Sequence, residues 1–142
     1  MESVIQCRKY EVWNAKLSHP DFEGACVVIQ NNTGNRHSPT TIVVPIVSEI
    51  QEFDLYIPID FDNRTKFILM SSVRTIDKTM FISNEPIEFI TNIELRNQIQ
   101  KLYFAIPGLK KVYKDKTIVF TKMTDDEIQE MYYGEHKTYT LH

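Results

Sequence analysis

The apolar residues of the chain follow strand-like patterns over the first ninety residues and helical spacing after them. Alternating or continuous apolar runs predict strands at residues 10–17, 25–30, 40–46, 52–59, 66–73 and 88–90. From Asn92 the apolar positions recur every three or four residues, until Pro107 and Gly108 end the pattern. Several closely spaced strands followed by one helix predict a mainly β fold, a small twisted barrel with the helix covering one side.

The most polar loop of the chain, residues 30–39, lies between two continuous apolar runs that predict strands buried on both faces. A loop held by two such strands is a common place for binding groups. Its candidates for contacting nucleic acid or a partner are Asn31, Asn32, Arg36 and His37. Each also has a structural alternative, because Asn side chains satisfy turn backbone and the two basic residues can brace a loop.

The chain changes character after residue 108. We expect residues 1–108 to form the barrel domain and residues 109–142 to form an extension packed on or beside it. Within the extension, the apolar run 118–120 predicts a strand, and Thr124 opens a capping-box pattern for a short helix. The final eight residues are expected to fray.

The start of this extension is basic. Lys110 and Lys111 precede Tyr113, so ammonium groups alternate with an aromatic ring that can stack on a base or a peptide. These three residues are candidates for binding nucleic acid or a partner. The alternative is a solvated surface without a ligand.

Composition and charge exclude several classes of protein. The chain has 142 residues, enough for one domain with its own core, and a formal net charge of −3. This charge disfavours non-specific binding to long duplex DNA but not a groove for a few single-stranded nucleotides. Cys7 and Cys26 form no CxxC pair, and no apolar run is long enough to span a membrane. We therefore expect a cytoplasmic protein with reduced thiols. No metal-ligand spacing or nucleotide-binding motif occurs, so no metal or cofactor is expected.

Three segments resemble the signatures of the MazF/PemK family, the RNA-cleaving toxins of toxin–antitoxin pairs. They are Gln-Asn-Asn-Thr-Gly-Asn-Arg-His-Ser-Pro-Thr at 30–40, Val-Pro-Ile-Val-Ser at 44–48 and Arg-Thr-Ile-Asp-Lys at 74–78. The resemblance covers residues 9–107 in the family's order. It implies an SH3-like barrel of the MazF/PemK/CcdB type with a C-terminal helix. It also implies a homodimer, an antitoxin-like or other protein partner, and single-stranded RNA as a ligand.

Several positions depart from the residues that the resemblance implies for catalysis. Cleavage through the 2′-hydroxyl of RNA needs a base, an acid and a group that stabilises charge. The family's arginine before the second strand is replaced by Gly24, and its threonine at the end of the next strand by Val47. Ser71 and Ser72 stand where an acidic residue and a glutamine are usual, and the loop 18–23 is shorter. These replacements predict a family member that binds a protein or nucleic acid in a regulatory or inhibitory role, without ribonuclease activity.

The alternative is an active, metal-independent endoribonuclease toxin with rearranged catalytic groups. The candidates for that role are His37, Arg74, Ser48 and His19, since a histidine and an arginine together can cleave RNA. Arg74 and the nearby Lys78 are also candidates for binding nucleic acid or a partner.

Overall fold

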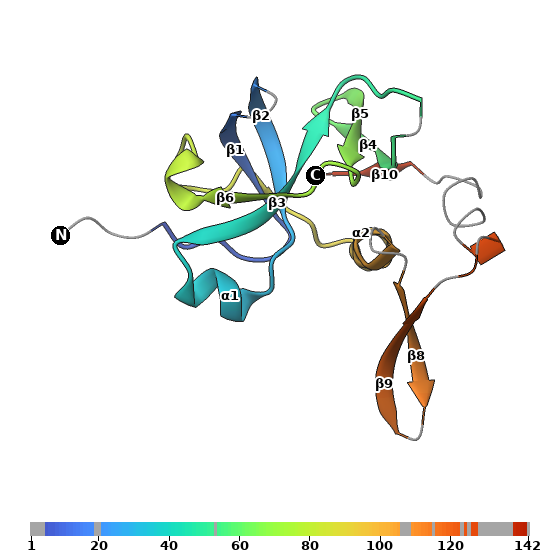
Figure 1. Ribbon diagram of the computed structural model, residues 1–142. Helices are drawn as coiled ribbons and strands as arrows, with labels where there is room; N and C mark the ends of the chain where they lie inside the picture. The colour runs from blue at the N-terminus through green and yellow to red at the C-terminus, as the bar shows by residue number, and fades with distance from the viewer. Residues whose placement is uncertain are drawn as a thin grey trace.

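The computed structural model describes residues 5–18, 21–52, 54–105, 109–114, 116–122, 124, 126–127 and 138–141. Two α-helices and a 3₁₀ turn accompany the strands of this part of the chain (Figure 1). The strands are β1 (Glu11–Ser18), β2 (Asp21–Val28), β3 (Thr40–Val47), β4 (Tyr56–Phe61), β5 (Arg64–Leu69), β6 (Arg74–Asp77), β7 (Glu88–Phe89), β8 (Leu109–Lys114), β9 (Thr117–Lys122) and β10 (Tyr139–Thr140). The helical elements are α1 (Asn32–His37), the 3₁₀ turn η1 (Lys78–Met80) and α2 (Ile93–Ala105).

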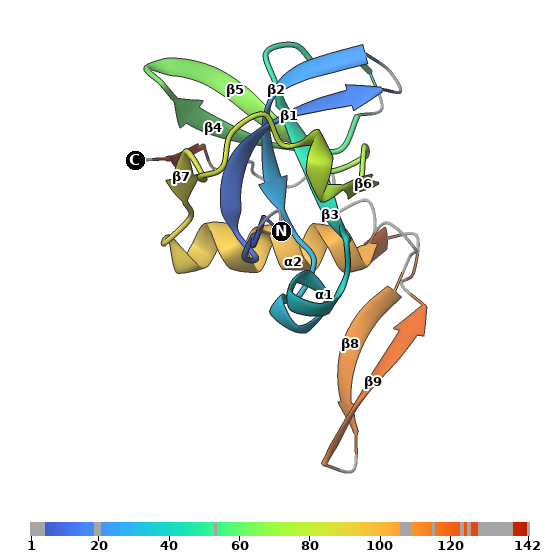
Figure 2. The same cartoon turned by 90° about the vertical axis from the view of Figure 1, so that its left-hand side faces the viewer.

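One curled sheet forms the body of the molecule, with the strand order β10-β4-β5-β3-β2-β1-β7 and with β6 paired to β3. The strand β3 belongs to both halves of this sheet. It pairs with β6 and β2 over Thr40–Pro45 and with β5 at Ile46 and Val47. The sheet can therefore wrap around one side of α2, as the two views show (Figures 1 and 2). The predicted mainly β, barrel-type fold with a covering helix is confirmed.

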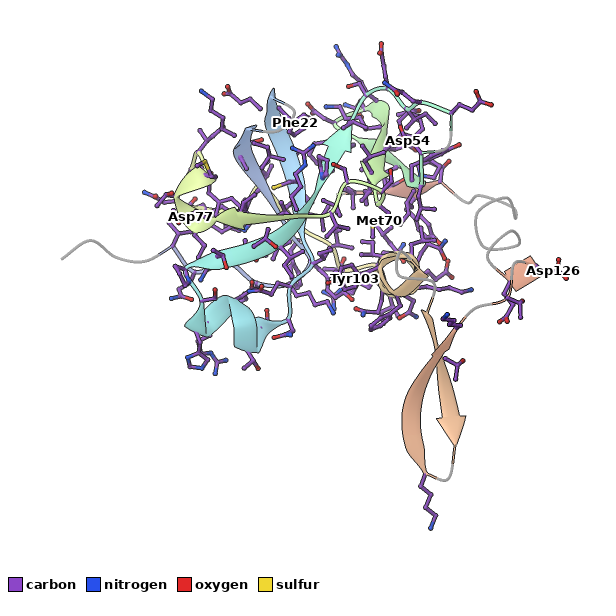
Figure 3. The ribbon with its side chains drawn as sticks, in the orientation of Figure 1. Phe22, Asp54, Met70, Asp77, Tyr103 and Asp126 are labelled. Atoms are coloured by element: carbon purple, nitrogen blue, oxygen red, sulfur yellow. The ribbon has the colours of Figure 1, made fainter. Side chains whose placement is uncertain are left out.

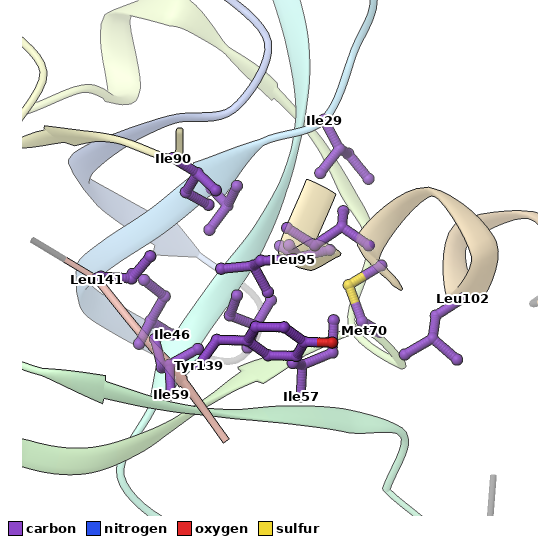
Figure 4. Packing of buried hydrophobic residues seen from close by; sticks show 14 of the residues in the cluster. Ile29, Ile46, Ile57, Ile59, Met70, Ile90, Leu95, Leu102, Tyr139 and Leu141 are labelled. Atoms are coloured by element: carbon purple, nitrogen blue, oxygen red, sulfur yellow. The ribbon is translucent and has the colours of Figure 1, made fainter. Parts of the chain in front are cut away.

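The helix α2 closes the concave side of the sheet. Its residues Leu95, Ile99 and Leu102 are spaced for one helix face and are all buried, as predicted. Asn92 caps the helix by accepting a hydrogen bond from the backbone N–H of Leu95 at 3.1 Å. Ile106, which the sequence pattern also assigns to this face, lies outside the described residues. Buried side chains of the sheet pack against the helix (Figure 4), among them Val12, Val27, Val44, Ile57, Ile59, Ile68 and Met70.

A second hydrophobic cluster covers the other face of β1, β2 and β3. Trp13 stacks on Phe81 with ring centroids 4.6 Å apart. Cys7 and Cys26 are buried free cysteines of this cluster. Burial raises the pKa of the Cys26 thiol to about 12 and also raises that of Cys7, so both thiols stay neutral and unreactive in the folded protein. Two clusters on opposite faces explain why the runs in β2 and β3 are continuously apolar.

Some element boundaries differ from the sequence-based prediction. The segment 18–24 was expected to be a turn, but β1 extends to Ser18 and β2 begins at Asp21, with which Ser18 pairs. The strand expected from residue 52 begins at Tyr56, and the strand expected from residue 66 begins at Arg64. Polar residues at the ends of a hairpin hide the extra pairs at Ser18 and Arg64, because ladder pairing there needs no apolar side chain, whereas β4 is shorter at its start than predicted.

The end of the chain is better ordered than the predicted frayed terminus. Tyr139 and Thr140 form the parallel strand β10 beside Ile59 and Asp60 of β4. Tyr139 and Leu141 are each only 9% exposed and belong to the main core (Figure 4). The prediction of fraying is therefore wrong for residues 139–141, because their side chains fill a space beside β4.

Two predictions for the preceding segment are confirmed. The apolar run 118–120 lies within β9, which pairs with β8 in a two-stranded hairpin. Thr124 accepts a hydrogen bond from the N–H of Glu127, whose carboxylate accepts one from the N–H of Thr124, a capping box. Within the described residues, none of the helices has the length and apolar character needed to cross a membrane.

Candidate functional site

The polar loop that the sequence singles out contains the short helix α1. Asn31 caps this helix by accepting a hydrogen bond from the N–H of Gly34 at 2.8 Å. The Asn32 side chain accepts a hydrogen bond from the N–H of Lys9 at 2.8 Å. Both side chains are therefore engaged with the backbone, as their structural alternative predicts. The remaining candidates of the loop, Arg36 and His37, are exposed in the last turn of the helix.

A buried polar network holds α1 against the sheet. The Asn35 side chain accepts hydrogen bonds from Thr41 Oγ1 at 2.6 Å and Gln30 Nε2 at 3.1 Å, and donates one to the Gln30 carbonyl at 2.8 Å. The Asn35 carbonyl accepts a hydrogen bond from the ammonium of Lys78. Sequence reasoning missed Asn35, because a polar residue in a polar loop carries no signal of burial.

The network also corrects the expectation for Lys78. This side chain is 3% exposed, and its ammonium donates into the protein interior. A lysine in this position fixes the loop to the end of β6, whereas a phosphate or a partner needs an ammonium at the surface. The structure thus removes Lys78 from the candidates for a ligand-binding surface.

The Arg-Thr-Ile-Asp segment builds the strand β6 and the turn after it. Arg74 is half-buried opposite Val43, and its Nε donates a hydrogen bond to Ser72 Oγ at 3.1 Å. Asp77 caps η1 at the far end of β6 (Figure 3), where it accepts hydrogen bonds from the N–H and hydroxyl of Thr79. These hydrogen bonds lower the pKa of the Asp77 carboxyl.

The strand β3 separates the residues of the alternative catalytic set. His37 precedes this strand, whereas Ser48 is exposed just beyond its other end. The eight residues of β3 span about 23 Å at the usual strand rise. Arg74 lies between these ends, opposite Val43, and His19 falls outside the described residues. Within one chain the structure does not bring His37 and Ser48 together.

The two replaced family positions lie on neighbouring strands, Gly24 in β2 and Val47 at the end of β3. Both positions lie beyond the last residues that β2 and β3 pair, Cys26 and Pro45. The ring of Phe22 covers Gly24, since a Cβ on this glycine would lie 3.1 Å from the Cζ atom of Phe22. Val47 also pairs with Phe67 of β5. Neither position therefore offers the guanidinium or the hydroxyl that the resemblance implies, because Gly24 lies under an aromatic ring and Val47 carries only methyl groups.

The remaining candidates lie on the hairpin of β8 and β9. Lys110, Lys111 and Tyr113 all belong to β8. Because successive residues of a strand lie on opposite faces, Lys111 shares a face with Tyr113, whereas Lys110 lies on the other face. The structure thus places these three residues on a different element from the candidates of the polar loop.

Comparison with known proteins points to the same family as the polar loop and the Arg-Thr-Ile-Asp segment. The model of the PemK-like, MazF-like toxins of type II toxin–antitoxin systems matches residues 8–103, which is more than half of the chain. The chain belongs to this family. The resemblance carried by the loop and by the Arg-Thr-Ile-Asp segment of this PemK/MazF-family protein is therefore confirmed.

Two curated relatives are similar over a shorter stretch. One, named endoribonuclease EndoA, from Bacillus subtilis, is 43% identical over 58 residues, which make up 37% of this chain and 50% of the relative. Another, named endoribonuclease MazF, from Staphylococcus saprophyticus, is 34% identical over 58 residues, 37% of this chain and 48% of the relative. The chain thus spans about half the length of the curated relatives it matches.

Solved structures support the same fold. An endoribonuclease from a mycobacterial species superposes with a TM-score of 0.60 at 15% identity, covering 75% of this chain and 96% of that one. A second, an endoribonuclease in complex with its cognate antitoxin, gives a TM-score of 0.61 at 14% identity, covering 73% and 97%. At this identity the likeness concerns the fold alone.

Proposed function

We propose that this PemK/MazF-family protein acts by binding a partner and does not cleave RNA by the chemistry of its family. The observation that carries the proposal is that Gly24, covered by the ring of Phe22, and Val47 stand at the places of the implied arginine and threonine. Loss of one group that stabilises the transition state typically costs about 10²–10³ in rate. Loss of a cation together with a hydroxyl leaves no acid or charge stabiliser at this place.

The competing function is an active endoribonuclease toxin, which the names of the two curated relatives favour. It requires groups among His37, Arg74, Ser48 and His19 to replace the missing ones. The length of β3 argues against joint action of His37 and Ser48 within one chain, since general acid–base catalysis requires groups within hydrogen-bond reach of one phosphate. We therefore prefer the binding function.

A cleavage assay distinguishes the two functions. We expect purified protein to produce no discrete new 5′ ends when it is incubated with a long single-stranded RNA in EDTA. The Bacillus subtilis relative in the same assay serves as the positive control. Discrete cuts that disappear in His37→Ala or Arg74→Ala would overturn the binding function and support the toxin. Cuts that persist in both variants would point to a contaminating nuclease and are checked with a second purification.

We further propose that the protein works as a cytoplasmic homodimer, as the resemblance implies. Large exposed apolar side chains follow the edge of the sheet beside β1, where the N–H groups of Ile82 and Ile87 donate to Asn14 and Val12 carbonyls. These side chains are Met80, Ile82, Ile87, Phe89 and Ile93. A second copy of the chain would bury them and gain the hydrophobic free energy.

Sedimentation equilibrium tests the dimer. We expect a mass of twice 16.7 kDa for the protein and a weaker dimer for Ile82→Ser/Ile87→Ser, because both side chains lose apolar area at the proposed contact. Lys16→Ser, on the exposed side of β1, should leave the mass unchanged. A protein that sediments at 16.7 kDa at every concentration would contradict the dimer.

A further inference from the structure

The hairpin of β8 and β9, residues Leu109–Lys122, differs in charge from the rest of the chain. Its 14 residues carry five lysines and one acidic residue, Asp115, although the whole chain has a net charge of −3. The remainder of the protein is therefore strongly acidic. Such segregation concentrates a positive field on one element, and a local field decides binding more than the net charge does.

The hairpin also stands apart from the barrel in space. Both views show β8 and β9 as a two-stranded ribbon that extends from the end of α2 away from the curled sheet (Figures 1 and 2). Within the described residues, these two strands form a separate sheet and pair only with each other. Lys116, near the tip, is exposed and adopts a positive φ of 63°, which closes the tight turn. A ribbon of this kind can reach a ligand that does not touch the barrel.

The register sorts the hairpin residues onto two faces. Leu109 pairs with Lys122, Lys111 with Phe120 and Tyr113 with Ile118, so these six residues share one face. On this face the positions of Tyr113 and Phe120 are diagonal neighbours, about 7–8 Å apart. Lys111 lies opposite Phe120, and Lys122 lies on the same strand two residues further. Two aromatic positions are thus flanked by two basic ones.

This arrangement matches the chemistry of a single-stranded nucleic acid. Aromatic rings provide platforms on which bases stack regardless of sequence, and lysines neutralise the phosphates between them. The opposite face carries the positions of Lys110 and Lys114, paired with Thr121 and Thr117, so lysines occur on both faces of the ribbon. An apolar protein partner would not require basic residues on both faces, whereas a polyanion does.

We infer that the hairpin is a binding arm for single-stranded RNA, with Tyr113 and Phe120 as stacking positions and Lys111 and Lys122 as phosphate contacts. This inference rests on the proposed function, a protein that acts by binding, and names the ligand class and the element that holds it. The RNA lies along the aromatic face of β8 and β9, outside the barrel.

Fluorescence anisotropy on the full chain tests the arm. The probe is a single-stranded 2′-O-methyl RNA, which chemistry through the 2′-hydroxyl cannot cut, so binding is measured separately from cleavage. For Lys111→Gln/Lys122→Gln we expect the dissociation constant to rise about tenfold, and the slope of log K against log salt to fall by about 1.4, since each single-strand phosphate contact contributes about 0.7. The matched control is Lys16→Gln/Lys101→Gln, two exposed lysines of β1 and α2, which should change neither quantity.

A second variant separates stacking from charge. Phe120→Leu keeps an apolar residue in β9 but removes the ring, so we expect about tenfold weaker binding with the salt slope unchanged. The inference is overturned if the wild type does not bind at low salt, if the control pair weakens binding as much as the hairpin pair, or if an RNA duplex binds as tightly as the single strand. RNA cleavage by the protein would instead overturn the proposed function and leave the arm standing.

Discussion

Replacing Asn35 with alanine should lower the free energy of unfolding by about 3–5 kcal/mol, one of the largest effects of a single substitution in this protein. The side chain is 1% exposed and makes three hydrogen bonds, to Thr41, to the Gln30 amide and to the Gln30 carbonyl. Alanine would leave these partners buried without their bonds, and each such group costs about 1–3 kcal/mol. Urea denaturation followed by circular dichroism measures the change.

Two further variants check the origin of this effect. Thr33→Ala, on the exposed side of the same helix, should change stability by no more than about 0.5 kcal/mol. Lys78→Met keeps the buried stem but removes the ammonium, so only the Asn35 carbonyl loses its donor, at a cost of about 1–3 kcal/mol. If Asn35→Ala and Thr33→Ala were equally stable, the buried network would not hold α1 to the sheet.

The elements that the sequence predicted correctly are those with a local pattern of burial. The apolar spacing of Leu95, Ile99 and Leu102 indicates α2, because the helix buries one continuous face. The strand β1 is likewise predicted by its apolar residues, of which Val12 and Leu17 are buried. The helix residues define one buried face, whereas Val12 and Leu17 lie on opposite faces of β1 and belong to different clusters.

The residues that escaped prediction depend on contacts between distant segments. In the sequence, Asn35 and Lys78 look like surface residues because both are polar. They lie 43 positions apart in the chain, yet they meet inside the protein. The contact of Phe22 with Gly24 is local, but its importance comes from the resemblance, which identifies Gly24 as a replaced position. No periodicity signals that a ring covers a glycine, so this part of the candidate site required the structure.

The strand β10 is the clearest example of such a distant contact. Its two residues are too few to show any alternation, and their partner strand β4 lies about eighty positions earlier in the chain. Pairing places Tyr139 and Leu141 in the main core beside Ile59. The strand β10 therefore contributes to the stability of the barrel, whereas the hairpin of β8 and β9, which precedes it in sequence, forms a separate sheet.

Deleting residues 139–142 should therefore destabilise the barrel by about 4 kcal/mol. Removal of a large buried side chain costs about 2–5 kcal/mol, and the deletion removes both Tyr139 and Leu141 from the core. It also exposes the edge of β4, whose Ile57 and Ile59 are buried in the intact protein. Thermal unfolding followed by circular dichroism on the full and shortened chains measures the difference.

Point variants decide whether the core contact or mere chain length is responsible. Leu141→Ala should lose about 2–3 kcal/mol, whereas Thr140→Ala, exposed between the two buried residues, should lose little. A deletion that left the unfolding temperature unchanged would show that β10 contributes nothing to the core. If the effect is as large as expected, a chain cut after Gly108 would lose stability together with the hairpin. The role of the hairpin must then be tested by substitution at positions such as Lys111 and Phe120, in a chain that retains its last strand.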